Sequence, residues 1–250
     1  MSSRAPCQTW CMDTLGLVHS PFVEKFGIPR QPGLTRHAHG YVELLSPYNR
    51  AEAVRGLGDF SHLWLTFIFH ENTRDEWQPT VRPPRLGGNQ RVGVFASRSP
   101  FRPNGLGLSV VRLESVEIEG ARIRLHISGM DLLHGTPIVD IKPYIPYADA
   151  IPDATANWAP AAPSSPMRVR YRSDVERWLN QADPQRYPAL RALLDDILGQ
   201  DPRPAYHRDR AEEDRVYGMR LFDLNIRWVV REQTTEVIEI RADSRPGDGF

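Results

Sequence analysis

The feature that most restricts the fold is a succession of short strand-type segments separated by glycine, proline and other turn residues. Residues 62–70 (HLWLTFIFH) form a continuous run of β-branched and aromatic residues, which predicts a strand buried on both faces. Residues 108–119 and 121–128 flank Gly120 and predict a hairpin. Further strands are expected at residues 15–19, 91–97 and 138–141.

A single helix is expected in this part of the chain, over residues 49–56, with Asn49 as its N-cap and Gly56 at its end. Many short strands with so few helices are typical of a small antiparallel β-barrel.

A proline-rich and alanine-rich stretch at residues 151–167 predicts a linker between two domains, residues 1–150 and residues 168–250. In the second domain we expect a strand at 167–172, helices at 174–182 and 188–199, and a meander of strands at 215–222, 225–230 and 236–241. The fold class is therefore mainly β: an N-terminal antiparallel barrel and a small α+β C-terminal domain.

Composition indicates a globular protein, because 40% of the 250 residues are hydrophobic and 25% are charged. We expect no membrane segment and no signal peptide, since no apolar stretch has the required length, and hence a cytoplasmic location. Cys7 and Cys11 form neither a disulfide framework nor a metal-ligand set. Taken alone, the formal net charge of zero argues against a nucleic-acid partner.

Positive charge is nevertheless concentrated in residues 77–112, which contain no acidic residue. The segment carries six arginines: Arg82, Arg85, Arg91, Arg98, Arg102 and Arg112. Arginine binds phosphate and carboxylate groups in a bidentate manner, and the prolines and glycines of the segment fix loop shapes. We expect an anionic partner here, with a solvated surface loop as the alternative. Arginine accounts for 29 of the 31 basic residues. This preference reflects either a need for bidentate binding of an anionic partner or a GC-rich genome.

The common nucleotide and metal motifs are missing from the sequence. Gly105-Leu106-Gly107 does not extend to G-x-G-x-x-G, and there is neither a P-loop nor a G-x-S-x-G elbow. His37, His39, His62 and His70 have no metal-ligand spacing, so we expect no metal site.

Two further segments have a composition suited to ligand binding. Residues 29–33 (PRQPG) predict a rigid loop that presents backbone groups. Residues 131–147 bring Asp131, His134, Asp140 and Lys142 into a turn and a strand, where Asp140 and Lys142 share a face and are suited to an ion pair.

Taken together, these segments resemble the TsaA-like family, and within it the TrmO-type tRNA (adenine-N6) methyltransferases. The resemblance extends over roughly residues 14–240, and its motifs lie at residues 29–33, 62–71, 82–88, 91–109, 131–149 and 201–206. It implies an S-adenosylmethionine-dependent enzyme on a β-barrel, a homodimer with the cofactor near the interface, and the anticodon loop of tRNA as partner. Its expected product is N6-methylated threonylcarbamoyladenosine next to the anticodon.

The resemblance also implies which residues form the site. Cofactor contacts are expected from Pro29, Arg30, Gln31, His70, Glu71, Arg98, Leu108, Asp131, Leu132, Leu133, His134, Gly135 and Thr136. RNA contacts are expected from Arg82, Arg85, Arg102, Lys142 and Tyr144.

The base that accepts the N6 proton is left open between Asp140, His134 and a chain of solvent molecules. Two other functions also stay open: an RNA-binding barrel without catalytic activity, and a methyltransferase of a small anionic substrate.

Overall fold

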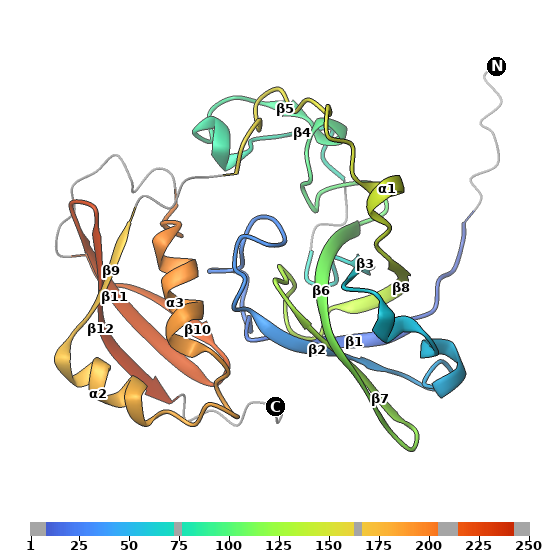
Figure 1. Cartoon of the computed structure of the whole chain (residues 1–250). Coiled ribbons are helices and arrows are strands. Elements are labelled where there is room, and N and C mark those ends of the chain that lie inside the picture. Colours follow the sequence, from blue (N-terminus) through green and yellow to red (C-terminus); the bar gives the residue numbers. More distant parts are fainter. Residues whose placement is uncertain (1–8, 73–76, 163–166, 205–214, 243–250) are drawn as a thin grey trace.

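The computed structural model describes residues 9–72, 77–162, 167–204 and 215–242, which form a barrel and a second, smaller sheet domain (Figure 1). The barrel is closed in the strand order β1-β2-β7-β6-β3-β8, and every neighbouring pair is antiparallel. The strands are β1 (Gly16–His19), β2 (His39–Leu44), β3 (His62–Ile68), β6 (Leu106–Glu119), β7 (Arg122–Ser128) and β8 (Pro137–Pro143). The predicted barrel and its β6–β7 hairpin around Gly120 are confirmed.

The barrel interior is filled by alternate residues of each strand, such as Leu63, Leu65 and Phe67 of β3. The prediction that residues 62–70 are buried on both faces is therefore wrong, because the intervening side chains, such as Trp64, lie half-buried on the outer face. A barrel wall has one face to the core and one outside. The apolar residues on both faces of β3 hid this alternation in the sequence.

Two short segments that the sequence assigned to regular elements are mostly irregular. In place of a capped helix at residues 49–56 there is a 3-10 turn, η1 (Ala51–Val54), and Asn49 instead donates from its side chain to the carbonyl of Ala121 at 2.6 Å. In place of a strand at residues 91–97 there is a two-residue strand followed by a 3-10 turn. The remaining short elements are η2 (Leu57–Asp59), β4 (Thr80–Val81), η3 (Pro84–Leu86), β5 (Val92–Gly93), η4 (Val94–Ala96) and α1 (Pro146–Asp149).

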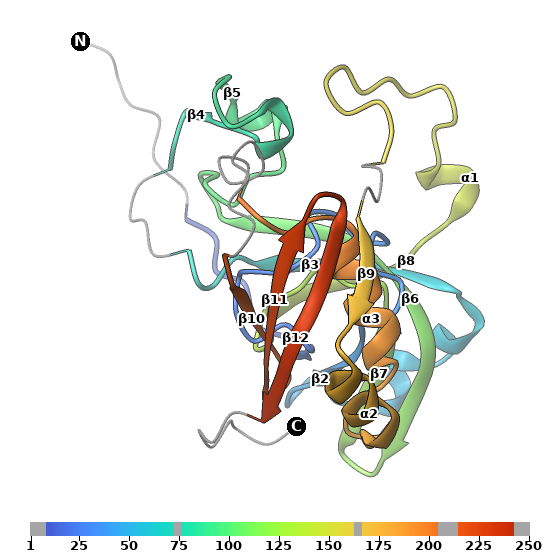
Figure 2. The same ribbon diagram turned by 90° about the vertical axis from the view of Figure 1, so that its left-hand side faces the viewer.

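The C-terminal part is a four-stranded sheet in the order β10-β11-β12-β9, in which β9 runs parallel to β12 (Figure 2). Its elements are β9 (Arg168–Tyr171), α2 (Ser173–Gln181), α3 (Leu190–Gly199), β10 (Tyr217–Leu221), β11 (Leu224–Arg231) and β12 (Thr234–Ala242). The predicted strands, meander and two helices are confirmed, except that α3 begins two residues late. Ala189 has a φ of 52°, a left-handed conformation that lies outside the helical region.

The barrel and the C-terminal sheet share a continuous apolar core, which contains Phe22 from the barrel side and Trp228 from the sheet. Phe22 also forms a β-bridge with Leu221 of β10. In the described part of the chain, no helix has the length and apolarity that crossing a membrane requires.

Candidate active site

Three segments that are distant in the sequence meet at one end of the barrel. The loop of residues 29–33 is attached to the end of β7, because the backbone N–H of Gly33 donates to the carbonyl of Gly129 at 2.8 Å. In the same loop the side-chain oxygen of Gln31 accepts a hydrogen bond from the Arg98 guanidinium at 2.6 Å. Pro29 is buried and Arg30 exposed. The expected cofactor residues Gln31 and Arg98 are therefore in direct contact.

Asp131, which follows the end of β7, supplies a negative charge beside this contact. Its carboxylate accepts a hydrogen bond from the Ser109 hydroxyl at 2.6 Å, and Arg98 favours its ionised form electrostatically. Burial acts in the opposite direction and dominates, so the pKa of Asp131 is raised to about 6. The carboxyl group thus changes charge close to neutral pH.

Ser109 is a site residue that the sequence reasoning missed. It is fully buried on the inner face of β6, whereas the expected cofactor residue Leu108 is 54% exposed on the outer face. The period-2 alternation of a strand could have identified it, because Leu108 and its neighbour must point to opposite sides of the wall.

The turn of residues 131–136 is held by its backbone on β1 and on the residues that follow β1. The N–H groups of His134 and Gly135 donate to the carbonyls of Phe22 and Val18, both at 2.8 Å. Leu132 and Thr136 are buried and Leu133 is half-buried, so these expected contacts can reach a ligand mainly through the backbone.

Gly135 marks the point where His70 approaches this turn. A Cβ atom at Gly135 would lie 4.0 Å from Nε2 of His70, and the φ of Gly135 is +76°. Glu71, the next expected contact, is exposed and forms an ion pair with Lys25 at 3.9 Å. His70 is thus close to the turn, and Glu71 is engaged with a lysine of the β1–β2 connection.

His134 has a fixed role in hydrogen bonding. Its Nδ1 accepts from the backbone N–H of Ser20 at 3.4 Å, so the neutral ring carries its proton on Nε2. Its ring meets that of His19 edge-on at 5.2 Å, and the pKa of His19 is lowered by burial and by the neighbouring His134. In this tautomer of the neutral ring, Nε2 of His134 is a donor and Nδ1 is occupied by Ser20.

Asp140, the other candidate base, lies on the outer wall of the barrel. Its carboxylate accepts from the backbone N–H of Ile141 at 3.0 Å and pairs with Lys142, which confirms the predicted ion pair. Thr66 of β3 pairs with Asp140 on one side and with Leu108 on the other, so these three residues form a row across three strands.

The expected RNA residues Lys142 and Tyr144 follow Asp140 along the same edge of the barrel. Lys142 is in register with Trp64, and the Tyr144 ring lies 5.8 Å from the Trp64 ring. The exposed Lys142 and the half-buried rings of Trp64 and Tyr144 therefore lie next to each other on this side of the barrel.

Most arginines of the acid-free segment are held by neutral oxygen atoms. Arg102 donates to the carbonyls of Ser97 and Ser99 at 2.9 and 3.4 Å, Arg85 donates to the carbonyl of Ala161, and Arg91 donates to the Thr80 hydroxyl at 2.7 Å. Arg112 pairs with Glu114, and Arg82 is exposed with no hydrogen bond or ion pair to any described residue. Among the described residues, Arg112 thus pairs with a carboxylate, whereas Arg85, Arg91 and Arg102 bond neutral oxygen atoms.

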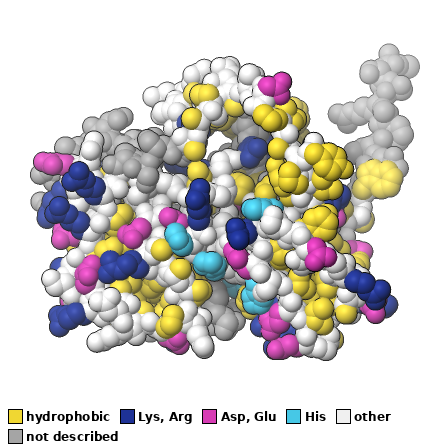
Figure 3. All heavy atoms as spheres, in the orientation of Figure 1, with side chains coloured by type: hydrophobic (Ala, Val, Ile, Leu, Met, Phe, Trp, Pro, Cys, Tyr) yellow, Lys and Arg dark blue, Asp and Glu magenta, His cyan; other side chains and the backbone are white. Residues whose placement is uncertain are grey.

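The surface view in Figure 3 shows where charged and histidine side chains gather on one face. Histidine side chains gather between the two domains, and Lys or Arg side chains lie beside them, below a hollow at the upper part of the molecule (Figure 3).

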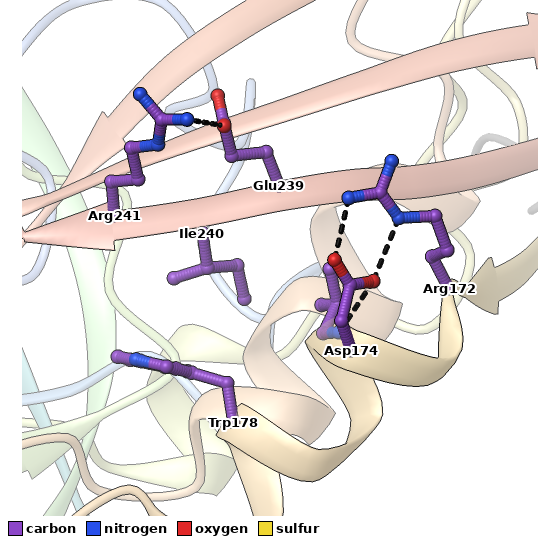
Figure 4. A pocket seen from close by; sticks show the side chains of 7 residues that line it. Arg172, Asp174, Trp178, Glu239, Ile240 and Arg241 are labelled. Carbon is purple, nitrogen blue, oxygen red and sulfur yellow. Dashed lines mark hydrogen bonds and ion pairs between the residues drawn. The ribbon is translucent and has the colours of Figure 1, made fainter.

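A pocket elsewhere, between α2 and β12, is lined by Arg172, Asp174, Trp178, Glu239, Ile240 and Arg241. Its arginines pair with its own carboxylates (Figure 4), so it offers no uncompensated charge to an ionic ligand. No metal-binding cluster occurs among the described residues.

Comparison with known proteins gives matches over both domains. The family model of the tRNA-methyltransferase O N-terminal domain matches residues 17–150, and that of the TrmO C-terminal domain matches residues 164–243. The chain is 47% identical over 228 residues to the tRNA (adenine(37)-N6)-methyltransferase of Escherichia coli K12, covering 91% of this chain and 96% of that protein.

Two further similarities come from Pseudomonas aeruginosa. A putative S-adenosylmethionine-dependent methyltransferase, RcsF, is 46% identical over 220 residues, covering 88% of this chain and 92% of that protein. A crystal structure of TrmO is 38% identical with a TM-score of 0.78, covering 94% of this chain and 99% of the solved one. A barrel without a Rossmann motif, the converging loop residues and both family domains lead to one conclusion: this chain belongs to the TrmO family of tRNA methyltransferases.

Proposed function

We propose that this chain is an S-adenosylmethionine-dependent methyltransferase that methylates N6 of the adenosine on the 3′ side of the anticodon in tRNA. The observation that carries the proposal is the contact of Gln31 with Arg98 beside the half-buried carboxylate of Asp131, in a member of this family.

The residues of the site fit the cofactor chemically. Asp131 carries the charge that complements a sulfonium, and Arg98 or Arg30 can hold the carboxylate of the methionine part. Bound S-adenosylmethionine supplies the electrophilic methyl group. Pro29, Gln31, His70, Glu71, Leu108 and residues 132–136 complete the proposed set. The rigid loop and the anchored turn favour catalysis by placing donor and acceptor in line.

On the RNA side, we propose that Arg82, Arg85 and Arg102 meet the anticodon loop. One of these arginines would pair with the carboxylate of a threonylcarbamoyl group on the substrate adenosine. Lys142 and Tyr144 would contact phosphate and an unstacked base, since aromatic side chains stack on bases taken out of a loop. Arg82 is the first choice for the carboxylate, because its guanidinium is exposed and bonds no described residue.

Asp140 is the preferred candidate for the group that receives the N6 proton. His134 presents a donor at Nε2. The carboxylate oxygens of Asp140 are acceptors, and they are occupied by the backbone N–H of Ile141 and by the exposed Lys142. An RNA phosphate that draws Lys142 away would free one carboxylate oxygen of Asp140. Proton transfer to solvent is the alternative route.

We further propose a cytoplasmic homodimer with the cofactor near the subunit interface, and domains at residues 1–150 and 168–250 joined by residues 151–167. The exposed Leu108, on the outer wall one residue from Ser109, supports an interface near the site. Size-exclusion chromatography with light scattering tests the dimer.

Methyl transfer from labelled S-adenosylmethionine to tRNA tests the proposed function. We expect labelling of a tRNA that carries threonylcarbamoyladenosine 3′ of the anticodon, and none when that position holds guanosine. Labelling of both RNAs, or of neither, contradicts the proposal. Binding of tRNA without any transfer would instead favour an RNA-binding barrel without catalytic activity.

A further inference from the structure

The β1–β2 connection, residues 20–38, carries the proposed cofactor residues Pro29, Arg30 and Gln31 at its middle. The connection lies between the barrel and the C-terminal domain, where Figure 1 shows it in blue between α3 and the barrel strands. It is held on both of these sides.

The first part of the connection is held by β10 and β11. The backbone N–H of Phe222 donates to the carbonyl of Pro21 at 2.8 Å, and the N–H of Arg220 donates to the Glu24 carboxylate at 2.9 Å. Phe26 stacks on the buried Trp228 with the ring centres 6.0 Å apart. The chain is thus fixed on the C-terminal sheet shortly before it reaches Pro29.

The second part is held by the end of α3. The side-chain amide of Gln200 donates to the carbonyl of Leu34 at 2.8 Å. The Asp196 carboxylate accepts from the backbone N–H of His37 at 3.1 Å and lies 3.0 Å from Nδ1 of the same residue. α3 itself is anchored by buried residues such as Ile197. The C-terminal domain therefore holds the connection on both sides of the cofactor residues.

We propose that Asp196 and Gln200 are positioning residues, through which the C-terminal domain holds the loop of residues 29–31 in its cofactor-binding conformation. The inference rests on the proposed function and adds a role for the second domain in cofactor affinity. A loop that is ordered before binding does not lose conformational freedom on binding. When the binding-competent fraction falls, the apparent dissociation constant rises by the same factor.

The test measures cofactor affinity of the full-length protein by isothermal titration with S-adenosylmethionine. The double variant Asp196→Ala, Gln200→Ala should bind about tenfold more weakly, since two hydrogen-bonded contacts are lost. Asp196→Asn keeps an acceptor for the N–H of His37 and should be intermediate. The matched control is Asp195→Ala, next to Asp196 in α3, because Asp195 bonds Tyr171 within the C-terminal domain.

A positioning role also predicts which quantities do not change. With saturating cofactor, the turnover number and the KM for tRNA of the double variant should stay within twofold of wild type, and Asp195→Ala should bind cofactor as wild type does. Equal cofactor affinity of the double variant and wild type overturns this inference alone, as does equal weakening by Asp195→Ala. Wild-type protein that binds no S-adenosylmethionine overturns the proposed function and this inference with it.

Discussion

Asp131→Asn should make the protein more stable at neutral pH while weakening cofactor binding. The pKa of Asp131 is raised from 3.8 to about 6, chiefly by burial. A carboxyl group with a raised folded-state pKa stabilises the fold when protonated, and this contribution is lost as the pH rises through the folded-state pKa. The asparagine is neutral at every pH and can still accept the hydrogen bond from Ser109.

The size of the effect follows from the pKa. A difference of roughly two pH units corresponds to about 3 kcal/mol of unfolding free energy, at about 1.4 kcal/mol per unit. We expect wild type and Asp131→Asn to be of similar stability near pH 4, and the variant to be more stable by up to about 3 kcal/mol above pH 7. The gap should open between pH 4 and pH 7.

Urea unfolding followed by circular dichroism, at half-unit steps between pH 4 and pH 8, measures this gap. The control is Asp174→Asn, because the ion pair with Arg172 lowers the pKa of Asp174 to about 2. Its carboxylate stabilises the fold above pH 4 and ceases to do so as the pH falls towards 2, so that substitution should destabilise at pH 7. A variant Asp131→Asn that is less stable than wild type at pH 7, or a gap independent of pH, would refute the reasoning.

Three other substitutions test separate parts of the account. Arg98→Ala removes the guanidinium that holds Gln31 and should abolish detectable cofactor binding in a titration; unchanged affinity would refute its placement. Gly40→Ala should lower the free energy of unfolding by about 3 kcal/mol, since its Cβ would lie 2.1 Å from a backbone oxygen, whereas Gly58→Ala has open space and should be nearly neutral in the same denaturant titration. Arg82→Ala should weaken binding of tRNA that carries threonylcarbamoyladenosine and leave binding of unmodified tRNA nearly unchanged, since Arg82 is assigned to the carboxylate of that group, and Arg55→Ala, also exposed, should change neither affinity.

Sequence reasoning predicted the regular elements best where one pattern was repeated. The hairpin around Gly120 combines a turn residue with two alternating runs, and the meander of the C-terminal sheet has the same character. Residues 49–56 have good helix formers, but the element is too short for propensity to decide, and only a 3-10 turn forms. At residues 91–97 the sequence alternates between apolar and polar residues as a strand would, but the chain turns within this segment and forms a 3-10 turn at Val94–Ala96.

The candidate site was predictable in its residue types and less so in its contacts. The acid-free arginine segment and the Pro29–Gln31 loop were visible as composition, because charge and rigidity are local properties. Alternation along β6 places Leu108 and Ser109 on opposite faces, but the bond from Ser109 to Asp131 was not visible, since it joins two segments that only the folded barrel brings together. The contacts of Asp196 and Gln200 with the β1–β2 connection were hidden for a related reason, as they join residues more than 150 positions apart.

The measurement that tests the central claim most directly is nucleoside analysis of tRNA after incubation with the protein and S-adenosylmethionine. Two tRNA preparations are compared, one carrying threonylcarbamoyladenosine next to the anticodon and one with unmodified adenosine there. The account predicts that mass spectrometry finds one added methyl group, on N6 of the threonylcarbamoyladenosine, in the first preparation and none in the second. Equal methylation of both preparations, or methylation of neither, would contradict it.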